Sequence, residues 1–186
     1  QAKPKELMAA DFEKLKADEL YNHLFFQDQR VRQKAQFELV NRSEGKSLFK
    51  KAALQTTNQL ARVHAIWGMG QLIAKKKADG KELESLLKDK DDEIVCQAAK
   101  VLGDVRYDKA GASLLSLVNN PNPRIQFFAS QALGRIAYKP AVLSLIALLK
   151  ANNDSDLFIR HAATLALSRI DDRPAVYALI NSPERS

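Results

Sequence analysis

One stretch of sequence decides the fold: Asn122-Pro-Arg-Ile-Gln-Phe-Phe-Ala-Ser-Gln-Ala-Leu-Gly-Arg-Ile136. Asn122 is a residue type that caps helices, and Pro123 suits the first position of a helix. The apolar residues that follow recur at spacings of three and four, which places them on one helical face; they are Ile125, Ala129, Ala132, Leu133 and Ile136. The stretch therefore predicts one amphipathic helix.

The same pattern occurs four more times. A small residue in the middle of each copy serves as an anchor, and the anchors are Ala35, Ala65, Ala98, Ala129 and Ala163. Each anchor has a capping residue seven positions before it and an apolar residue four positions after it. The caps are Asp28, Asn58, Asp91, Asn122 and Asp156, and the apolar residues are Leu39, Met69, Leu102, Leu133 and Leu167. Anchors separated by 30, 33, 31 and 34 residues predict an all-α solenoid of stacked helices.

A second, shorter apolar stretch lies between successive capped helices, so the repeating unit is helix, turn, helix. We expect about five such pairs over residues 17–181, after a linker or a frayed first turn at residues 1–16. The last pair has a first helix over residues 174–180 but no second one, and the sequence opens at Gln1. We therefore expect a piece excised from a larger protein, with residues 182–186 as its C-terminal tail.

Composition narrows the function classes. The 186 residues are 46% apolar and 27% charged, which is typical of a globular protein, and no apolar run approaches the length of a membrane helix. The net charge of +7 makes nucleic acid a partner to consider, but the lysines are scattered, which favours an ordinary solvated surface. The single cysteine, Cys96, excludes an internal disulfide framework and a multi-cysteine metal or haem motif.

The repeated pattern resembles HEAT repeats of the short, PBS-lyase-like type. Their motif Asp-x-x-Val-Arg-x-x-Ala-x-x-x-Leu is present from Asp28 to Leu39 and returns in part at Ile159, Arg160 and Ala163. The resemblance implies a right-handed α-α superhelix, which is an armadillo-like fold. In such a solenoid the second helix of each pair lines the concave surface where partners bind.

A closer resemblance rests on three stretches: Asp28-Gln-Arg-Val-Arg-Gln-Lys-Ala-Gln-Phe-Glu-Leu39, Leu60-Ala-Arg-Val-His-Ala-Ile-Trp-Gly-Met-Gly-Gln-Leu72 and Ala98-Ala-Lys-Val-Leu-Gly-Asp104. They resemble the HEAT region of large exported bacterial proteins of the planctomycete and Bacteroidetes type. Proteins of that family place the HEAT array between a propeller resembling sugar dehydrogenases and a c-type cytochrome domain with Cys-x-x-Cys-His. The resemblance implies a periplasmic or extracellular protein in which this chain is a spacer or docking scaffold. Neither flanking domain is in this sequence, so no catalytic residue and no cofactor is carried over.

Candidate partner-binding residues are the large or charged residues of the second helices that point away from the core. They are His64, Trp67, Gln71, Lys100, Arg124, Phe127, Phe128, Gln131, Arg135, Phe158, His161 and Arg169. Aromatic and arginine residues are enriched at protein interfaces, so we expect an apolar stripe rimmed by arginines. The alternative is that the curvature of the array packs these side chains between repeats.

Other chemistry has weak support. Arg32 and Arg160 stand four residues after Asp28 and Asp156, a spacing that favours helical ion pairs. The histidines lack the converging ligands that zinc needs, and Cys96 is expected to be a small packing residue. The glycines that follow three of the repeated apolar residues belong to no phosphate-binding motif, and close approach of helices explains them better.

We expect no enzymatic activity from this chain alone and a protein as its partner. Two alternatives stay open. The first is a nucleic-acid-binding module similar to the HEAT-like DNA glycosylases, supported by the net charge and by Trp67 but weakened by the presence of a single tryptophan. The second is a bilin lyase-like protein, an enzyme class that shares the short repeat.

Overall fold

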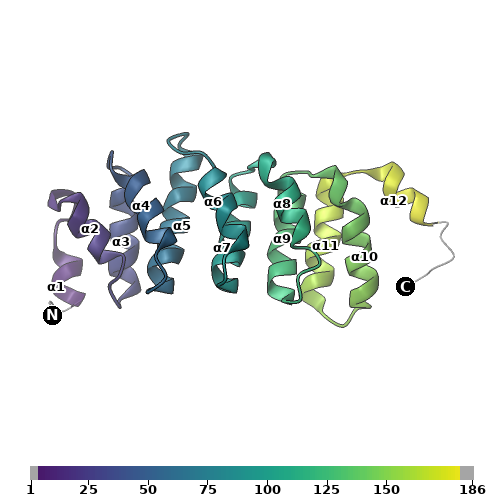
Figure 1. Ribbon diagram of the computed structural model, residues 1–186, viewed down its shortest axis with the longest axis horizontal. Coiled ribbons are helices and arrows are strands. Elements are labelled where there is room, and N and C mark those ends of the chain that lie inside the picture. The colour runs from purple at the N-terminus through teal and green to yellow at the C-terminus, as the bar shows by residue number, and fades with distance from the viewer. Residues whose placement is uncertain (1–3, 181–186) are drawn as a thin grey trace. The chain divides into compact units, whose positions relative to one another are not determined.

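The computed structural model describes the backbone of residues 4–180 and the side chains of residues 4–177. Within this part of the chain every regular element is a helix (Figure 1), with twelve α-helices and four short 3-10 helices. None of these helices is both long and apolar enough to cross a lipid bilayer. The predicted all-α fold is confirmed.

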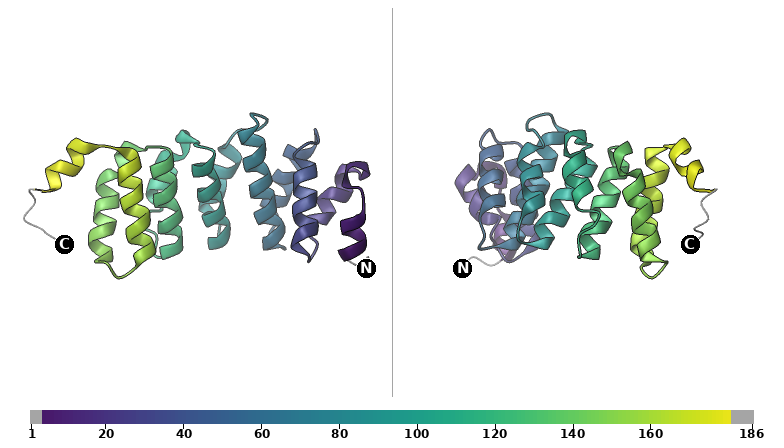
Figure 2. Two further views of the ribbon diagram at one scale, coloured as in Figure 1. Left: turned by 180° about the vertical axis from the view of Figure 1, so that it is seen from behind. Right: turned by 45° about the vertical axis from the view of Figure 1, so that its right-hand side comes forward.

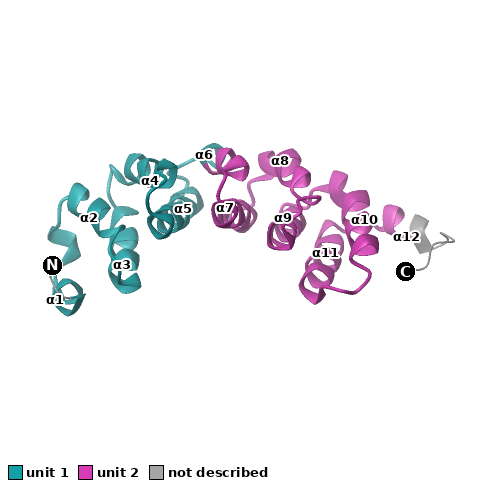
Figure 3. Cartoon of the chain, turned by 60° about the horizontal axis from the view of Figure 1, so that its bottom comes forward, with its two compact units in different colours: residues 1–82 teal, residues 83–186 magenta. Residues whose placement is uncertain are grey.

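The chain divides into two compact units, Gln1–Glu82 and Leu83–Ser186 (Figure 3). The α-helices of unit 1 are α1 (Pro4–Ala9), α2 (Ala17–His23), α3 (Gln29–Leu39), α4 (Gly45–Leu54) and α5 (Gln59–Ala74). Those of unit 2 are α7 (Asp92–Asp104), α8 (Gly111–Ser116), α9 (Pro123–Arg135), α10 (Val142–Asn152), α11 (Leu157–Ile170) and α12 (Arg173–Ile180). The short helix α6 (Lys81–Ser85) crosses the boundary between the units.

Each unit is built from helix pairs. In unit 1, α2 packs on α3 and α4 packs on α5. In unit 2, α8 packs on α9 and α10 on α11, while α7, α9 and α11 pack side by side, as the view from behind shows (Figure 2). The helix, turn, helix unit expected from the sequence is therefore present in both units.

All five predicted caps are confirmed. A side-chain oxygen of Asp28, Asn58, Asp91, Asn122 or Asp156 accepts a hydrogen bond from a backbone N–H in the first turn of α3, α5, α7, α9 or α11. Each bond satisfies one of the donors that a helix leaves unpaired at its start. The five anchor alanines are fully buried, as the pattern requires.

The glycines after the repeated apolar residues allow close helix packing. A Cβ atom added to Gly103 in α7 would lie 2.7 Å from the Cα atom of Ala132 in α9. A Cβ atom added to Gly134 in α9 would lie 2.6 Å from the Cα atom of Ala166 in α11. Because real Cβ contacts are not this short, the helices approach as closely as they do only with glycine at these positions.

The start of the chain differs from the sequence expectation. Instead of a linker or a frayed turn, residues 4–14 form α1 and a 3-10 helix (Phe12–Lys14), and both pack on α3. Phe12 is buried, and the Nζ atom of Lys34 lies 4.6 Å above its ring. The same amine donates hydrogen bonds to the carbonyl oxygens of Met8 and Ala10 at 3.1 and 2.8 Å. One buried ring and one lysine of the next repeat thus order a stretch whose polar composition had indicated a linker. The tail expected at residues 182–186 lies outside the described residues.

Candidate functional site

The second helices of unit 2 present one surface that carries most of the predicted site. Figure 3 shows α7, α9 and α11 on one side of the unit and α8 and α10 on the other. We call the outward side of α7, α9 and α11 the second-helix face. Its residues recur at spacings of three and four along each helix; they include Glu93, Lys100 and Asp104 on α7, Arg124, Phe128, Gln131 and Arg135 on α9, and Phe158, Leu165 and Arg169 on α11.

An apolar groove lies at the N-terminal ends of α9 and α11. We call it the phenylalanine groove; it holds about 360 Å³ and is lined by Pro123, Arg124, Phe127, Phe128, Asp156, Phe158 and Ile159. The ring of Phe127 meets that of Phe128 edge-on at 5.1 Å and that of Phe158 at 6.4 Å. Phe158 is 74% exposed. Three rings therefore come together on a surface open to water.

Arg124 sits at the edge of the groove without adding net charge to it. Its guanidinium lies 5.7 Å from the centre of the Phe128 ring and pairs with Glu93 of α7 at 2.8 Å. Its backbone N–H donates to the capping side chain of Asn122, whose Nδ2 atom donates in turn to Asp92 at 2.8 Å. These bonds tie the starts of α7 and α9 together and hold the arginine against the ring.

A polar pocket lies at the C-terminal ends of the same helices. We call it the arginine pocket; it holds about 420 Å³ and is lined by Gly103, Asp104, Arg106, Gly134, Arg135, Ala137 and Arg169. The Asp104 carboxylate pairs with Arg135 at 2.8 Å and with Lys100 at 2.7 Å. Among the residues that the structure describes, Arg106 and Arg169 form no ion pair. The lining therefore carries three guanidinium groups against one carboxylate.

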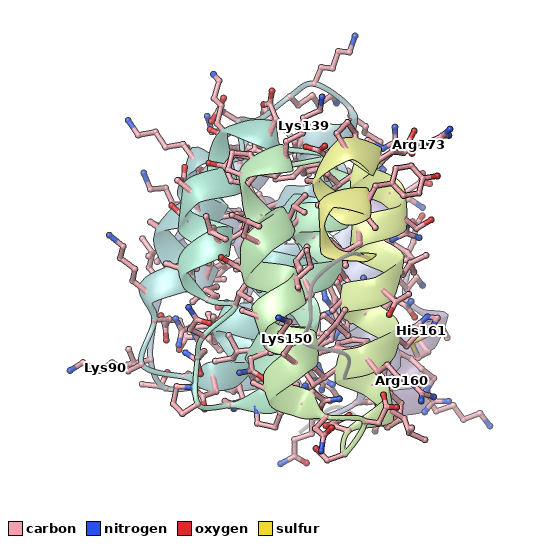
Figure 4. The ribbon with its side chains drawn as sticks, turned by 90° about the vertical axis from the view of Figure 1, so that its right-hand side faces the viewer. Lys90, Lys139, Lys150, Arg160, His161 and Arg173 are labelled. Carbon is pink, nitrogen blue, oxygen red and sulfur yellow. The ribbon has the colours of Figure 1, made fainter. Side chains whose placement is uncertain are left out.

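The structure distributes the predicted residues of unit 2 between these two sites. Arg124, Phe127, Phe128 and Phe158 line the groove, and Arg135 and Arg169 line the pocket. Lys100 does not line the pocket, but it forms an ion pair with Asp104, which does. The remaining two are separate: Gln131 lies on α9 between the two sites, and His161 is exposed on α11 beside Arg160 (Figure 4).

Arg106 is a site residue that sequence reasoning missed. It follows the end of α7 in a left-handed conformation, with a φ angle of 54°. The repeated sequence positions are the caps, anchors and apolar residues of the helices, and none of them lies in the turn after α7. A signal was present, because Arg106 stands three residues after Gly103 as Ala137 stands three after Gly134, and Ala137 is also left-handed.

His64 in unit 1 is not a surface residue, which corrects the prediction. It is 2% exposed, and its Nδ1 atom lies 2.8 Å from the Oε1 atom of Gln36 on α3. The other end of that amide, Nε2, donates to Oε1 of Gln71 at 2.9 Å. Because a carbonyl oxygen accepts, the Nδ1 atom of the imidazole is the donor of this bond. Burial, with a smaller effect of the Arg32 charge, lowers the pKa of His64 to about 4.

Trp67 and Gln71 are half-buried on α5. The Trp67 ring meets the His64 ring edge-on at 5.0 Å. His64 is therefore packed between repeats, which was the alternative to partner binding, because the Gln36 amide of the preceding repeat covers it. A stripe running from Trp67 to the phenylalanines of unit 2 stays a prediction.

The arginines four residues after the caps act differently from the predicted ion pairs. Arg32 is buried and donates to the carbonyl oxygens of Phe26 and Gln27 at 2.8 and 2.6 Å, while Asp28 pairs with Arg30 at 2.6 Å. In the same way Arg62 donates from Nε to the carbonyl oxygen of Ala53 at 2.8 Å. The predicted pair between Arg32 and Asp28 is wrong, because the arginine side chain turns back to the connection that precedes its helix.

Arg160 also departs from the predicted pairing. Its Nη1 atom lies 3.5 Å from Asp154, in the turn before α11. Its capping residue, Asp156, accepts instead from the backbone N–H groups of Phe158 and Ile159.

The remaining candidates for chemistry are placed as packing or surface residues. Cys96 is buried in α7, and burial raises its thiol pKa to about 11, which keeps it protonated at neutral pH. In the part of the chain that the structure describes, no group of three or more His, Cys, Asp or Glu side chains is arranged to hold a metal ion. Basic side chains such as Lys90, Lys139 and Arg173 project outward from separate segments of unit 2 (Figure 4).

Comparison with known proteins identifies structures with a similar fold. Solved structures resemble this chain at low sequence identity, which shows the fold alone. The complex of CpcE and CpcF of phycocyanin lyase from Nostoc sp. PCC7120 has a TM-score of 0.67 and 18% identity, over 92% of this chain and 71% of that one. Human deoxyhypusine hydroxylase in complex with glycerol has a TM-score of 0.56 and 15% identity, over 83% of this chain and 62% of that one.

A designed armadillo repeat protein in complex with the peptide (KR)4 has a TM-score of 0.51 and 15% identity, over 92% of this chain and 94% of that one. No curated protein sequence matches this chain. The sequence model of HEAT repeats matches residues 47–125, 80–157 and 112–182, which together span most of the chain. By these matches the chain belongs to the HEAT-repeat family.

Proposed function

We propose that this chain is a non-catalytic HEAT-repeat scaffold and that the second-helix face of unit 2 binds a partner protein. The phenylalanine groove carries the proposal, because Phe158 is 74% exposed beside two further rings. Covering a phenylalanine side chain fully contributes about 1.5–3 kcal/mol. Aromatic and arginine residues, which line this groove, are also enriched at known protein interfaces.

The designed armadillo protein supports the choice of ligand. Its structure is a complex with a peptide, and it shares the fold of this chain over 92% of the length. A surface built from parallel second helices suits a peptide segment, because each repeat adds a similar strip of side chains. We therefore propose a protein segment as the ligand of the second-helix face.

Selection of peptides on the full chain tests this proposal. We expect a random phage-displayed library to yield sequences with an aromatic or large aliphatic residue, and Phe158→Asp to abolish their binding. Leu143→Asp is the matched control, because Leu143 is 71% exposed on α10, outside the groove. A library that gives no enrichment, or peptides that bind both variants alike, would contradict the proposal.

We further propose the setting of the chain within a larger protein. In this proposal the chain is a spacer between a propeller domain resembling sugar dehydrogenases and a c-type cytochrome domain, in a periplasmic or extracellular protein. The resemblance of the stretches that begin at Asp28, Leu60 and Ala98 supports it. The test is the parent reading frame together with the absorption spectrum of the full-length protein. A downstream Cys-x-x-Cys-His and a Soret band are expected, and a frame of helical repeats alone would contradict this setting.

A bilin lyase-like function is a second candidate. It is supported by the similarity to the CpcE and CpcF complex of phycocyanin lyase over 92% of this chain. Incubation of the full chain with a bilin and an acceptor protein tests it. Covalent bilin on the acceptor would favour the lyase-like function, and an unmodified acceptor would favour the scaffold function.

A nucleic-acid module similar to the DNA glycosylases has less support. Those enzymes resemble one another in having several tryptophans and an Asp in one concave cleft, whereas this chain has a single tryptophan. That residue, Trp67, packs against His64, and Asp104 is shared by Lys100 and Arg135. A steep loss of duplex DNA affinity with added salt would be the observation in its favour.

A further inference from the structure

The phenylalanine groove and the arginine pocket lie at opposite ends of the same two helices. Phe158 and Arg169 are eleven residues apart on α11, and Phe128 and Arg135 are seven apart on α9. A helix rises about 1.5 Å per residue, so the two sites are separated by about 10–16 Å along the helix axes. A single ligand of modest length can therefore reach both.

The guanidinium groups of the arginine pocket are available to a ligand. Asp104 is shared between Arg135 and Lys100, so one carboxylate faces two cations. Arg106 and Arg169, the other two arginines of the lining, form no ion pair among the described residues. Guanidinium groups bind carboxylates through paired, charge-assisted hydrogen bonds, so an acidic side chain fits this pocket.

The carbonyl oxygens at the C-terminal ends of α7 and α9 accept hydrogen bonds from backbone N–H groups and not from these arginines. After α7, the backbone N–H groups of Val105, Arg106 and Tyr107 donate to the carbonyl oxygens of Val101, Gly103 and Leu102 at 2.9, 3.1 and 3.0 Å. The residues that follow α9 repeat this arrangement. Backbone groups thus satisfy carbonyls that arginine side chains would otherwise cap.

The surface between the two sites favours an extended ligand. Gln131 lies between them and is half-buried, and its amide can both donate to and accept from a peptide backbone. A helical ligand would need a continuous apolar strip, and the middle of this face carries one apolar side chain, Leu165, besides the polar Lys100 and Gln131. An extended chain advances about 3.3 Å per residue, so three to five residues span about 10–16 Å.

We propose that the second-helix face of unit 2 binds an extended acidic segment of a partner protein. A large apolar side chain fills the phenylalanine groove, and an Asp or Glu about four residues away pairs with Arg106, Arg135 and Arg169 in the arginine pocket. This proposal rests on the proposed scaffold function and adds to it the charge and the spacing of the partner segment. The near-neutral groove and the cationic pocket together define that pattern.

Fluorescence anisotropy with synthetic peptides tests the pattern on the full chain. Each labelled peptide carries one Phe and one pair of Glu residues in a Gly/Ser background, separated by one, four or nine residues, in both orders. A further peptide carries Lys in place of Glu, and another lacks the acidic pair. We expect the four-residue spacing to bind at least about tenfold more tightly than all the others, and to weaken with added salt.

Charge reversals locate the acidic group. The double variant Arg106→Glu and Arg169→Glu should weaken the four-residue peptide at least about tenfold. The charge-matched control is Lys88→Glu with Lys90→Glu. Lys88 ends the 3-10 helix Leu86–Lys88, both lysines are exposed, and Lys90 projects away from the helices (Figure 4). This control should change the affinity less than about twofold. Arg106→Gln with Arg169→Gln and a melting curve for each variant separate loss of binding from loss of folding.

Several outcomes would overturn this inference. They are equal affinity for the Lys and Glu peptides, equal affinity at all spacings, and equal effects of the pocket and control variants. Absence of binding by every synthetic peptide also overturns it. So does binding of duplex DNA to the arginine pocket when the acidic peptide does not bind there. If phage-selected peptides still bind through Phe158, the scaffold function stands without the acidic requirement, so the two failures are distinguishable.

Discussion

The Oε1 atom of Gln36 on α3 accepts a hydrogen bond from Nδ1 of His64 on α5 at 2.8 Å, while the same amide donates to Gln71. One glutamine thus joins two side chains of the next repeat inside unit 1. Burial, with a smaller effect of the Arg32 charge, keeps the imidazole neutral at pH 7, because a charged ring is costly away from water. A buried neutral histidine links the stability of the repeat to pH.

We expect unit 1 to lose stability as the pH falls from 7 to 5. The pKa of His64 is about 4 in the folded chain against 6.5 for the exposed imidazole, so only the unfolded state gains a proton in this range. The free energy of unfolding should fall by about 2 kcal/mol between pH 7 and pH 5. Urea unfolding at several pH values measures this. His64→Gln should flatten the dependence, and His161→Gln, which removes an exposed histidine, is the matched control. An equal slope in both variants would contradict the assignment.

Adding a single methyl group at a helix crossing should destabilise unit 2. In Gly134→Ala the new Cβ atom would lie 2.6 Å from the Cα atom of Ala166, so α9 and α11 would have to separate. We expect a loss of about 1–3 kcal/mol, as for overpacked cores. Thermal melts compare this variant with Thr164→Ala, which is exposed on α11 and should stay within about 0.5 kcal/mol of the parent. A neutral Gly134→Ala would show that the helices are not in close contact.

Arg32→Met should cost far more stability than Arg30→Met. Arg32 is buried and bonds two carbonyl oxygens, which would lose their partner, so we expect a loss of about 2–4 kcal/mol. Arg30 is largely exposed and pairs with Asp28, and its loss should cost at most about 1 kcal/mol. Urea unfolding of both variants at neutral pH makes the comparison. Equal losses would mean that the helical ion pair, and not the carbonyl contacts, carries the stability.

Local patterns predicted the helices of this protein well. The capping side chains act within one turn of their own helix, so Asp28 and Asn122 could be assigned from spacing alone. The glycine contacts were also predictable, because Gly103 and Gly134 recur in register in neighbouring helices. Phe12 gave no such signal, since a single ring among polar residues shows no period, and it packs against His23 and beneath Lys34 of another repeat.

The site was predicted only as far as a helix face defines it. Spacing placed Arg124, Phe128 and Arg135 on one side of α9, and they do line the groove and the pocket there. Spacing could not tell that Gln36 of the preceding repeat covers His64, because that contact depends on how the pairs stack. It also missed Arg106, whose position follows from the turn after α7 and not from the helical period.

Truncation of two aromatic residues should separate binding from packing. Phe158→Ala removes a ring that is 74% exposed, so we expect the free energy of unfolding to stay within about 0.5 kcal/mol while the phage-selected peptides lose affinity. Trp67→Ala removes a half-buried ring that packs on the buried His64, so we expect a loss of about 2–4 kcal/mol of stability and unchanged affinity. Anisotropy and urea unfolding on the same preparations measure both quantities. A Trp67→Ala variant that folds with full stability but no longer binds the peptides would place the binding surface on unit 1. A Phe158→Ala variant that binds normally would show that the phenylalanine groove is not part of the binding surface.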